Sequence, residues 1–467
     1  MSNTAQISAN TSNDFSENLS DPKKVFFSYA AKISHLKFTL LLEHFATKAD
    51  DVFYYCEPDS NISFLSFEIL NKQSFSFDNY ELLAEEISVL KSKLVSNHSD
   101  YEKFNLPIFI TSVKFPIKKD SEEWNDFNDI DFIVPKIILF QHSGTCFIVA
   151  NFFSESFSHH ENFNEFLERE TELIYNLENR LQESTDNRTI LKDISNSNDF
   201  ENWENKIDSV VEEIKREKID KVVIARRIEK EITSPINWQK TLGELNIKYP
   251  TCTNFLYKSG KSIFFGSTPE ILIKYSGNTF FTEALAGSIR RGTDPEHDKL
   301  LENELLNSEK NNVEHNAVID YIKKSVFNFV DQVEIVKNPV VKKLPNIQHL
   351  QTSVTGTLKS KDQVFKIIST LFPTPAVCGI PKEQSLKMIE KTETFDRGLF
   401  SGVIGWFNAD NYGEFFVTIR SALVKDNKLY AYAGCGIVDG SDPKEEFEET
   451  QLKLKPILSL FNNADKN

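Results

Sequence analysis

The sequence is poor in cysteine, in long apolar runs and in positive charge. Its five cysteines are scattered and none forms a CxxC pair, which argues against a disulfide framework and indicates reduced thiols in a cytoplasmic protein. No apolar run reaches about 18 residues, so no transmembrane helix is expected. The net charge of −16 disfavours binding to nucleic acid or to an anionic membrane. A pocket for an anion would therefore have to gather its own cationic groups.

Familiar signatures of cofactor sites are also missing. The chain has no phosphate-binding P-loop and no His/Cys spacing that is typical of a zinc site. Its N-terminus is polar and lacks the apolar segment of a signal peptide, so residues 1–22 are expected to be a disordered tail.

The composition is that of a globular protein, with 40% hydrophobic and 26% charged residues, and the chain is long enough to bury a large core. Residues 23–199 carry no motif that we can match. Within them, an amphipathic helix is expected over 161–181. The polar residues 183–199 predict a linker or a long surface loop.

Residues 200–467 show a clearer pattern of secondary structure. A mainly helical stretch is expected over 295–330, entered through Asp294 and Pro295. Strands are expected at 221–226, 263–265 and 271–275. Mixed strands and helices of this kind predict an α/β (α+β) fold.

The helix that is expected after Asp442 and Pro443 carries the most informative side chains. Glu446, Glu449 and Lys453 recur at i, i+3 and i+7, so they share one face of that helix. Two carboxylates beside an ammonium group can hold a hard cation next to an anion. The alternative is a solvated acidic face, which is common at the start of a helix because of the helix dipole.

Glu314 is a second source of carboxylate oxygens. It lies at i, i+4 and i+7 with Val318 and Tyr321, on an otherwise apolar helix face. It is therefore either a surface residue at the edge of this stripe or a buried ligand. Together with Glu449 it would suit Mg²⁺, which takes oxygen ligands. The neighbouring His315 is expected to be structural.

Three other charged residues belong to expected strands or turns. Arg420 lies in a strand expected over 415–422, where it either forks onto a carboxylate or reaches solvent from an edge. Lys221 begins a strand and is either a base with a lowered pKa or a solvated strand end. Glu270 follows a turn and is either an acid with a raised pKa or an ordinary turn carboxylate.

Four of these charged residues, namely Lys221, Glu270, Glu314 and Arg420, fall within eight short runs of sequence. The runs are KVVIAR at 221–226, FGSTPE at 265–270, TEALAGS at 282–288, SEKNNVEH at 308–315, FPTPA at 372–376, FDRG at 395–398, VTIR at 417–420 and AGCGIV at 433–438. In this order, over roughly half of the chain, they resemble the chorismate-utilising enzymes. The resemblance implies a sandwich of two large, mainly antiparallel sheets with helices outside, in which residues 23–199 and 200–467 form one composite domain.

The resemblance also implies a role for each matched residue. Lys221 is expected to be the general base that activates water for attack at C2 of chorismate, and Glu270 the general acid that protonates the departing C4 hydroxyl. Glu314 and Glu449 are expected to bind Mg²⁺, which holds the ring carboxylate, with Glu446 nearby through water. The expected substrate-binding residues are Leu285, Ala286, Gly287, His349, Ala376, Arg420, Gly434 and Lys453.

Two residues favour water over ammonia as the nucleophile within this family. Anthranilate synthase uses ammonia and lacks a lysine at the position of Lys221, whereas aminodeoxychorismate synthase carries a lysine at the position of Ala286. The run at 282–287 is most similar to menaquinone-type isochorismate synthases. We therefore expect a cytoplasmic enzyme, monomeric or weakly dimeric, that makes isochorismate for menaquinone or siderophore biosynthesis. The alternatives are a salicylate synthase, an anthranilate synthase component and an inactive chorismate-fold binding module.

Three residues depart from the family pattern. Phe372 stands where a histidine is common, and Cys378 and Cys435 replace residues that are usually glycine or alanine. They flank the expected site without supplying its charges. We therefore expect altered packing and not a loss of activity.

Overall fold

The computed structural model describes residues 24–77, 80–119, 121–154, 160–182, 188–194, 199–217 and 219–463, so the tail expected at 1–22 lies outside the described residues. The helices are α2 (Phe38–Lys48), α3 (Tyr80–Ser92), α4 (His160–Arg180), α5 (Asp199–Glu217), α6 (Trp238–Lys248), α7 (Pro295–Asn307), α8 (Glu309–Val326), α9 (Val364–Leu371), α10 (Lys382–Thr392) and α11 (Pro443–Leu458).

The strands of the first half are β1 (Val25–Ile33), β2 (Asp51–Glu57), β3 (Ile62–Phe75), β4 (Leu94–Ser96), β5 (Phe109–Val113), β6 (Ile130–His142), β7 (Thr145–Ser154), β8 (Ile190–Asp193), β9 (Lys221–Ile232), β10 (Thr253–Ser259) and β11 (Ser262–Thr268). The later strands are β12 (Ile271–Ser276), β13 (Thr279–Arg290), β14 (Val330–Ile335), β15 (Val340–Lys343), β16 (Ile347–Leu358), β17 (Gly379–Ile380), β18 (Val403–Phe407), β19 (Tyr412–Val417), β20 (Ser421–Lys425), β21 (Lys428–Ile437) and β22 (Asn462–Asn463).

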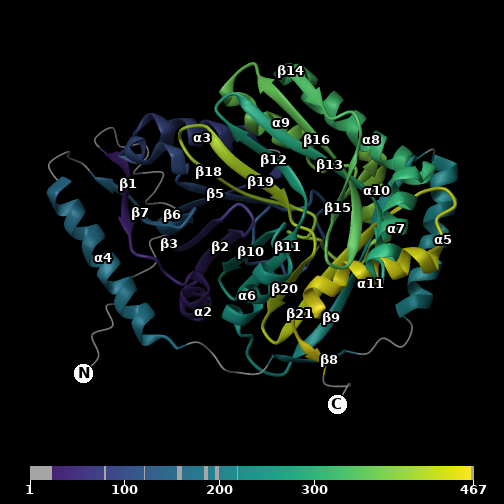
Figure 1. The fold of residues 1–467 in the computed structure, drawn as a ribbon, viewed down its shortest axis with the longest axis horizontal. Helices are drawn as coiled ribbons and strands as arrows, with labels where there is room; N and C mark the ends of the chain where they lie inside the picture. The colour runs from purple at the N-terminus through teal and green to yellow at the C-terminus, as the bar shows by residue number, and fades with distance from the viewer. Residues whose placement is uncertain are drawn as a thin grey trace.

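These strands form one continuous, mainly antiparallel sheet. It folds into two large faces, the first and the second sheet, which are joined through β6 and β3 (Figure 1). The first sheet runs β7-β6-β3-β2-β10-β11-β20-β21-β9. The second runs β6-β5-β18-β19-β12-β13-β16. The sheets are joined because residues 137–142 of β6 pair with β7 and residues 130–133 with β5, while β3 follows β6 along both parts. The expected fold is confirmed, with helices on the outside of the sheets.

Aromatic side chains fill the space between the two sheets. Trp406 of β18 lies 6.0 Å from Tyr55 of β2 and 5.7 Å from Phe64 of β3, measured between ring centroids. Phe416 of β19 lies 5.4 Å from Phe255 of β10. All five rings are buried. Such aromatic pairs contribute about 0.5–1.5 kcal/mol each beyond the burial of their surface, so they hold the sheets face to face.

Local capping explains where the two helices of the stretch expected over 295–330 begin. The helical stretch at 295–330 is two helices, because Ser308 leaves the helical conformation and its Oγ accepts a hydrogen bond from the Asn311 backbone N–H. Asp294 caps α7 as expected, accepting from the backbone N–H of His297 at 2.9 Å. The loop expected at 183–199 is wrong in part, since β8 pairs there with β9 and β22.

Two general expectations can be compared with the described residues. All five cysteines are buried and unpaired. Among the described residues, no helix is long and apolar enough to span a membrane.

The single strand expected over 415–422 is wrong. β19 ends at Val417 and β20 begins at Ser421, and Arg420 between them has a positive φ of 52°. β19 pairs in the second sheet and β20 in the first, so the chain crosses between the sheets at this point. Residues 415–422 were expected to form one strand because nothing in their pattern marks the point where the chain crosses between the sheets. Arg420 is a buried residue at the junction of the sheets.

Candidate active site

A cavity of about 320 Å³ lies where α8 and α11 meet the ends of several strands. Its size suits a small-molecule ligand. Every site residue expected from the sequence contributes to its lining, although those residues come from nine separate stretches of chain. They are Lys221, Glu270, Leu285, Ala286, Gly287, Glu314, His349, Ala376, Arg420, Gly434, Glu446, Glu449 and Lys453.

Lys221, the first residue of β9, has a buried side chain that is 9% exposed. It passes directly over Gly436 of β21, where an added Cβ would lie 2.2 Å from Lys221 Cε, so only glycine leaves room for it. Its Nζ donates to Glu314 Oε1 at 2.5 Å. This geometry excludes the interpretation of Lys221 as a solvated strand end.

Glu270 lies buried between β11 and β12. The Thr374 hydroxyl donates to its Oε1 at 3.2 Å. Burial raises the pKa of Glu270 to about 7, in spite of the nearby positive charges of Lys221 and Lys342, which lower it. A carboxyl with this pKa carries a proton in a large fraction of molecules at neutral pH and can act as a proton donor.

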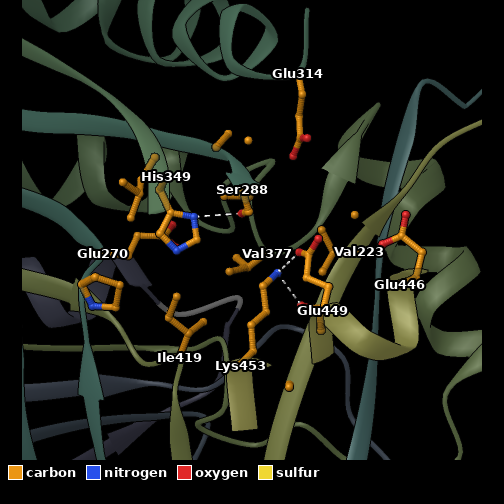
Figure 2. Close-up of a pocket in the computed structure, with 18 of the residues that line it drawn as sticks. Val223, Glu270, Ser288, Glu314, His349, Val377, Ile419, Glu446, Glu449 and Lys453 are labelled. Carbon is orange, nitrogen blue, oxygen red and sulfur yellow. Dashed lines mark hydrogen bonds and ion pairs between the residues drawn. The ribbon is translucent and has the colours of Figure 1, made fainter. Parts of the chain in front are cut away.

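A chain of hydrogen bonds orients Arg420 within the cavity. Arg420 Nη2 lies 3.2 Å from His349 Nε2. His349 Nδ1 in turn lies 2.9 Å from the Ser288 hydroxyl (Figure 2). Because a guanidinium can only donate, His349 accepts at Nε2 and carries its proton on Nδ1. Burial and then the Arg420 charge lower the pKa of His349 well below its usual range, so the ring is neutral.

The Arg420 side chain retains a free donor. Its Nη1 is buried and has no hydrogen-bond partner within the described part of the chain. An orphaned donor of this kind costs free energy unless a ligand accepts from it. Arg420 is therefore poised to bind an anionic group in the cavity.

The acidic face of α11 lies on the opposite side of the cavity from Glu314 (Figure 2). Lys453 Nζ contacts Glu449 Oε1 at 2.6 Å and donates to the Gly434 carbonyl at 2.9 Å. Glu446 accepts from the Ser441 hydroxyl at 2.9 Å, and burial followed by the charge of Glu449 raises the pKa of Glu446. The interpretation of this helix face as solvated is therefore excluded for Glu446, which is buried.

The three carboxylates supply only oxygen ligands, which suits a hard cation. Among the described residues, however, no three Asp, Glu, His or Cys side chains are already grouped to hold a metal ion. Glu314 and Glu449 each form an ion pair with a lysine instead. An ion that bound there would have to replace the two ammonium groups.

Some residues of the site were not identified from the sequence. Ser288 orients His349, and its backbone N–H donates to Asn311 Oδ1 at 3.2 Å. The preceding residue, Gly287, has a φ of 78°, and the register between β13 and β16 shifts there. Ser288 and Asn311 fall inside two of the matched runs, but nothing local indicates that they touch. His315 is structural as expected, because it is buried and bonds Ala286 O and Thr352 Oγ1.

The three departures from the family pattern lie beside the cavity and are absent from its lining among the described residues. Phe372 packs edge-on against Phe115 at 6.5 Å between ring centroids. Cys378 and Cys435 are buried, and Cys435 hydrogen-bonds Glu446. Their effect on packing and activity stays a prediction.

Comparisons with known proteins give a consistent result. The profile of the family described as "Chorismate binding enzyme" matches residues 13–462. Isochorismate synthase MenF of Bacillus subtilis (strain 168) is 30% identical over 446 residues, which cover 94% of this chain and 93% of that protein. The salicylate biosynthesis isochorismate synthase of Pseudomonas aeruginosa is 33% identical over 267 residues, 56% of each chain. The structure of the menaquinone-specific isochorismate synthase MenF from Escherichia coli has the same fold, with a TM-score of 0.74 and 21% identity over 96% of this chain and 98% of that one.

Proposed function

This chain belongs to the chorismate binding enzyme family, and from that premise we propose that it is an isochorismate synthase, which converts chorismate into isochorismate. One observation carries the proposal: a buried lysine and a protonatable buried glutamate line the same cavity as an arginine with a free donor. These groups are the base, the acid and the anion-binding group that an exchange of hydroxyl positions on an anionic ring requires.

Lys221 and Glu270 would divide the proton transfers between them. Lys221 acts as the neutral amine once it is released from its ion pair with Glu314, and its Nζ takes a proton from water as the water oxygen bonds to C2 of chorismate. The ring double bond shifts and the C4–O bond breaks. Glu270 gives its proton to the departing hydroxyl, which leaves as water. One water enters and one leaves, so the product is an isomer of the substrate.

The cationic groups of the cavity would bind the substrate's carboxylates despite the net charge of −16. The free Nη1 of Arg420 supports its role in binding the enolpyruvyl carboxylate, together with Lys453 and the backbone at Gly434. The remaining lining residues Leu285, Ala286, Gly287, His349 and Ala376 would shape the space around the ring.

Mg²⁺ fits the carboxylates on the two sides of this cavity. Glu314 and Glu449 would hold the ion, with Glu446 acting through water, and a bound Mg²⁺ would neutralise the ring carboxylate of chorismate. The acidic ligands provide the oxygen donors that Mg²⁺ prefers. Lys221 and Lys453 would be released from their ion pairs when the carboxylates turn to the metal.

The decisive experiment is to incubate the pure protein with chorismate and Mg²⁺ and to identify the products by chromatography. We expect isochorismate. Salicylate with pyruvate as the main products would make the protein a salicylate synthase, and ammonia-dependent anthranilate would contradict the role of Lys221. Binding of chorismate without any product would indicate an inactive binding module.

We further propose the setting in which this reaction takes place. The protein is cytoplasmic, monomeric or weakly dimeric, and serves menaquinone or siderophore biosynthesis. Residues 23–199 and 200–467 act as one composite domain, which is supported by the pairing of β5 with β18 and of β2 with β10. Sedimentation analysis of the pure protein tests the oligomeric state.

Replacing Lys221 with alanine should lower kcat by about 10²- to 10⁴-fold, because water then has no base to accept its proton. Chorismate binding should change much less, since Arg420 and Lys453 remain. Steady-state kinetics and calorimetric titration with chorismate measure the two effects separately. The exposed Lys337 provides a control, Lys337→Ala, which should behave as wild type. Near-normal turnover of Lys221→Ala would remove Lys221 as the base.

Replacing Glu449 with glutamine should weaken Mg²⁺ binding about 10-fold or more, because one charged oxygen ligand is lost. Calorimetric titration with Mg²⁺ alone measures this directly. Glu448→Gln on the exposed side of the same helix is the matched control and should bind Mg²⁺ as wild type does. Equal affinity of the Glu449→Gln and wild-type proteins would contradict the ligand role.

A further inference from the structure

Behind Glu270, outside the cavity lining, lies a buried ion pair between β15 and β13. Lys342 Nζ donates to Glu283 Oε1 at 3.1 Å, and the two side chains are only 13% and 1% exposed. Gln351 of β16 donates to the other oxygen of Glu283. The same Lys342 Nζ donates to the carbonyl of Pro269 at 2.7 Å. Lys342 therefore holds the backbone directly before Glu270.

Glu283 and Lys342 also take part in the electrostatic surroundings of Glu270. The charged groups that face Glu270 are Lys221 from β9, Glu283 from β13, Lys342 from β15 and Arg420 from the connection between β19 and β20. Glu283 is the only negative one among these. Its charge opposes ionisation of Glu270, whereas the lysines favour it.

Stability alone is a weak explanation for a pair of charges at this place. A buried ion pair is often no more stabilising than a pair of well-packed apolar residues, because both ions must be desolvated. Neither Glu283 nor Lys342 belongs to the cavity lining among the described residues, so neither is placed to touch the substrate. Their influence on the reaction would have to pass through Glu270.

We propose that Lys342 and Glu283 are a positioning pair for the proton donor. Lys342 fixes the backbone that carries Glu270, and Glu283 places a buried negative charge in the surroundings of the Glu270 carboxyl. This inference rests on the proposed role of Glu270 and adds the residues that prepare it for that role.

The test is a titration of the Glu270 carboxyl by infrared spectroscopy, with Glu270→Gln as the reference that identifies its band. In Glu283→Gln the midpoint should fall by about one pH unit, because the opposing charge is gone while both lysines remain. The alkaline limb of the kcat/KM profile should move by the same amount. Glu283→Asp keeps the charge and should restore the midpoint. Glu334→Gln, at an exposed position on β14, is the control.

An unchanged midpoint in a folded Glu283→Gln protein would overturn the inference. If that variant does not fold, Lys342→Gln is titrated instead; its midpoint should rise, because Glu283 then faces Glu270 without a counter-charge, and a midpoint that stays or falls overturns the proposal. The infrared titration does not depend on turnover. If Glu270→Gln stays active while the midpoint shifts in Glu283→Gln, the acid role of Glu270 fails but the electrostatic coupling holds.

Discussion

Replacing Glu270 with glutamine is expected to lower kcat about 10²- to 10⁴-fold and, at pH 8, to make the protein more stable than wild type. Burial raises the pKa of this carboxyl from 4.5 to about 7. The unfolded chain ionises it above about pH 4.5, whereas the folded chain keeps it protonated until about pH 7, so wild-type stability falls over that interval and stays low above it. At 1.36 kcal/mol per pKa unit, the loss is at most about 3 kcal/mol. Glutamine has no charge to bury, so the variant does not lose this stability.

Urea unfolding at pH 5 and at pH 8 measures this effect. The advantage of Glu270→Gln over wild type should be small at pH 5 and grow to its full size at pH 8, while kcat falls about 10²- to 10⁴-fold at both. In wild type, kcat/KM should decline as the pH rises above about 7, because the donor loses its proton. The same stability difference at both pH values would show that Glu270 is not held protonated by the fold. Substantial remaining turnover would remove it as the acid.

Replacing Arg397 with methionine is expected to destabilise the protein by about 3–5 kcal/mol, because it leaves the Glu393 carboxylate buried without the cation that pairs with it. Arg397 forks onto Glu393, with Nε at 2.8 Å and Nη2 at 2.5 Å from the two oxygens, and both side chains are at most 2% exposed. The guanidinium also donates to the carbonyls of Val377 and Val223, each at 2.8 Å. It thus ties β9, which begins with Lys221, to the segment that follows Ala376.

A double variant separates the charge effect from the loss of packing. Arg397→Met/Glu393→Gln removes the unpaired charge and keeps an acceptor for the Ala225 N–H, which Glu393 binds at 2.7 Å. Much of the lost stability should therefore return. Arg169→Met on the exposed face of α4 is the control, because its side chain is 65% exposed. The explanation is wrong if the double variant is as unstable as Arg397→Met in urea unfolding.

The parts of the site that the sequence predicted well are those that depend on neighbours along the chain. Asp442 caps α11 and accepts from the backbone N–H groups of Lys444 and Glu445. Once that helix starts, its periodicity alone places Glu446 and Glu449 on one side. The order of the eight runs then identified the family, since matching an order of motifs does not require knowledge of their contacts.

The sequence could not predict how these pieces meet. Arg420 was expected within a strand, and only the crossing between the two sheets explains its positive φ and its place beside His349. The contact between Lys342 and Pro269 joins residues more than 70 positions apart. No local pattern encodes such contacts, because strand order and register are decided by packing of the whole sheet.

For this protein, the sequence by itself determined which chemical groups are present and on which helix faces or strand ends they lie. Lys221, the residue with which the eight matched runs begin, was already a candidate base for that reason. Only the tertiary structure decided that Lys221 is buried over Gly436 and that Glu270 has a pKa of about 7. The physical reason is that burial and charge proximity depend on segments far apart in the chain, whereas capping and periodicity depend on residues within a few positions.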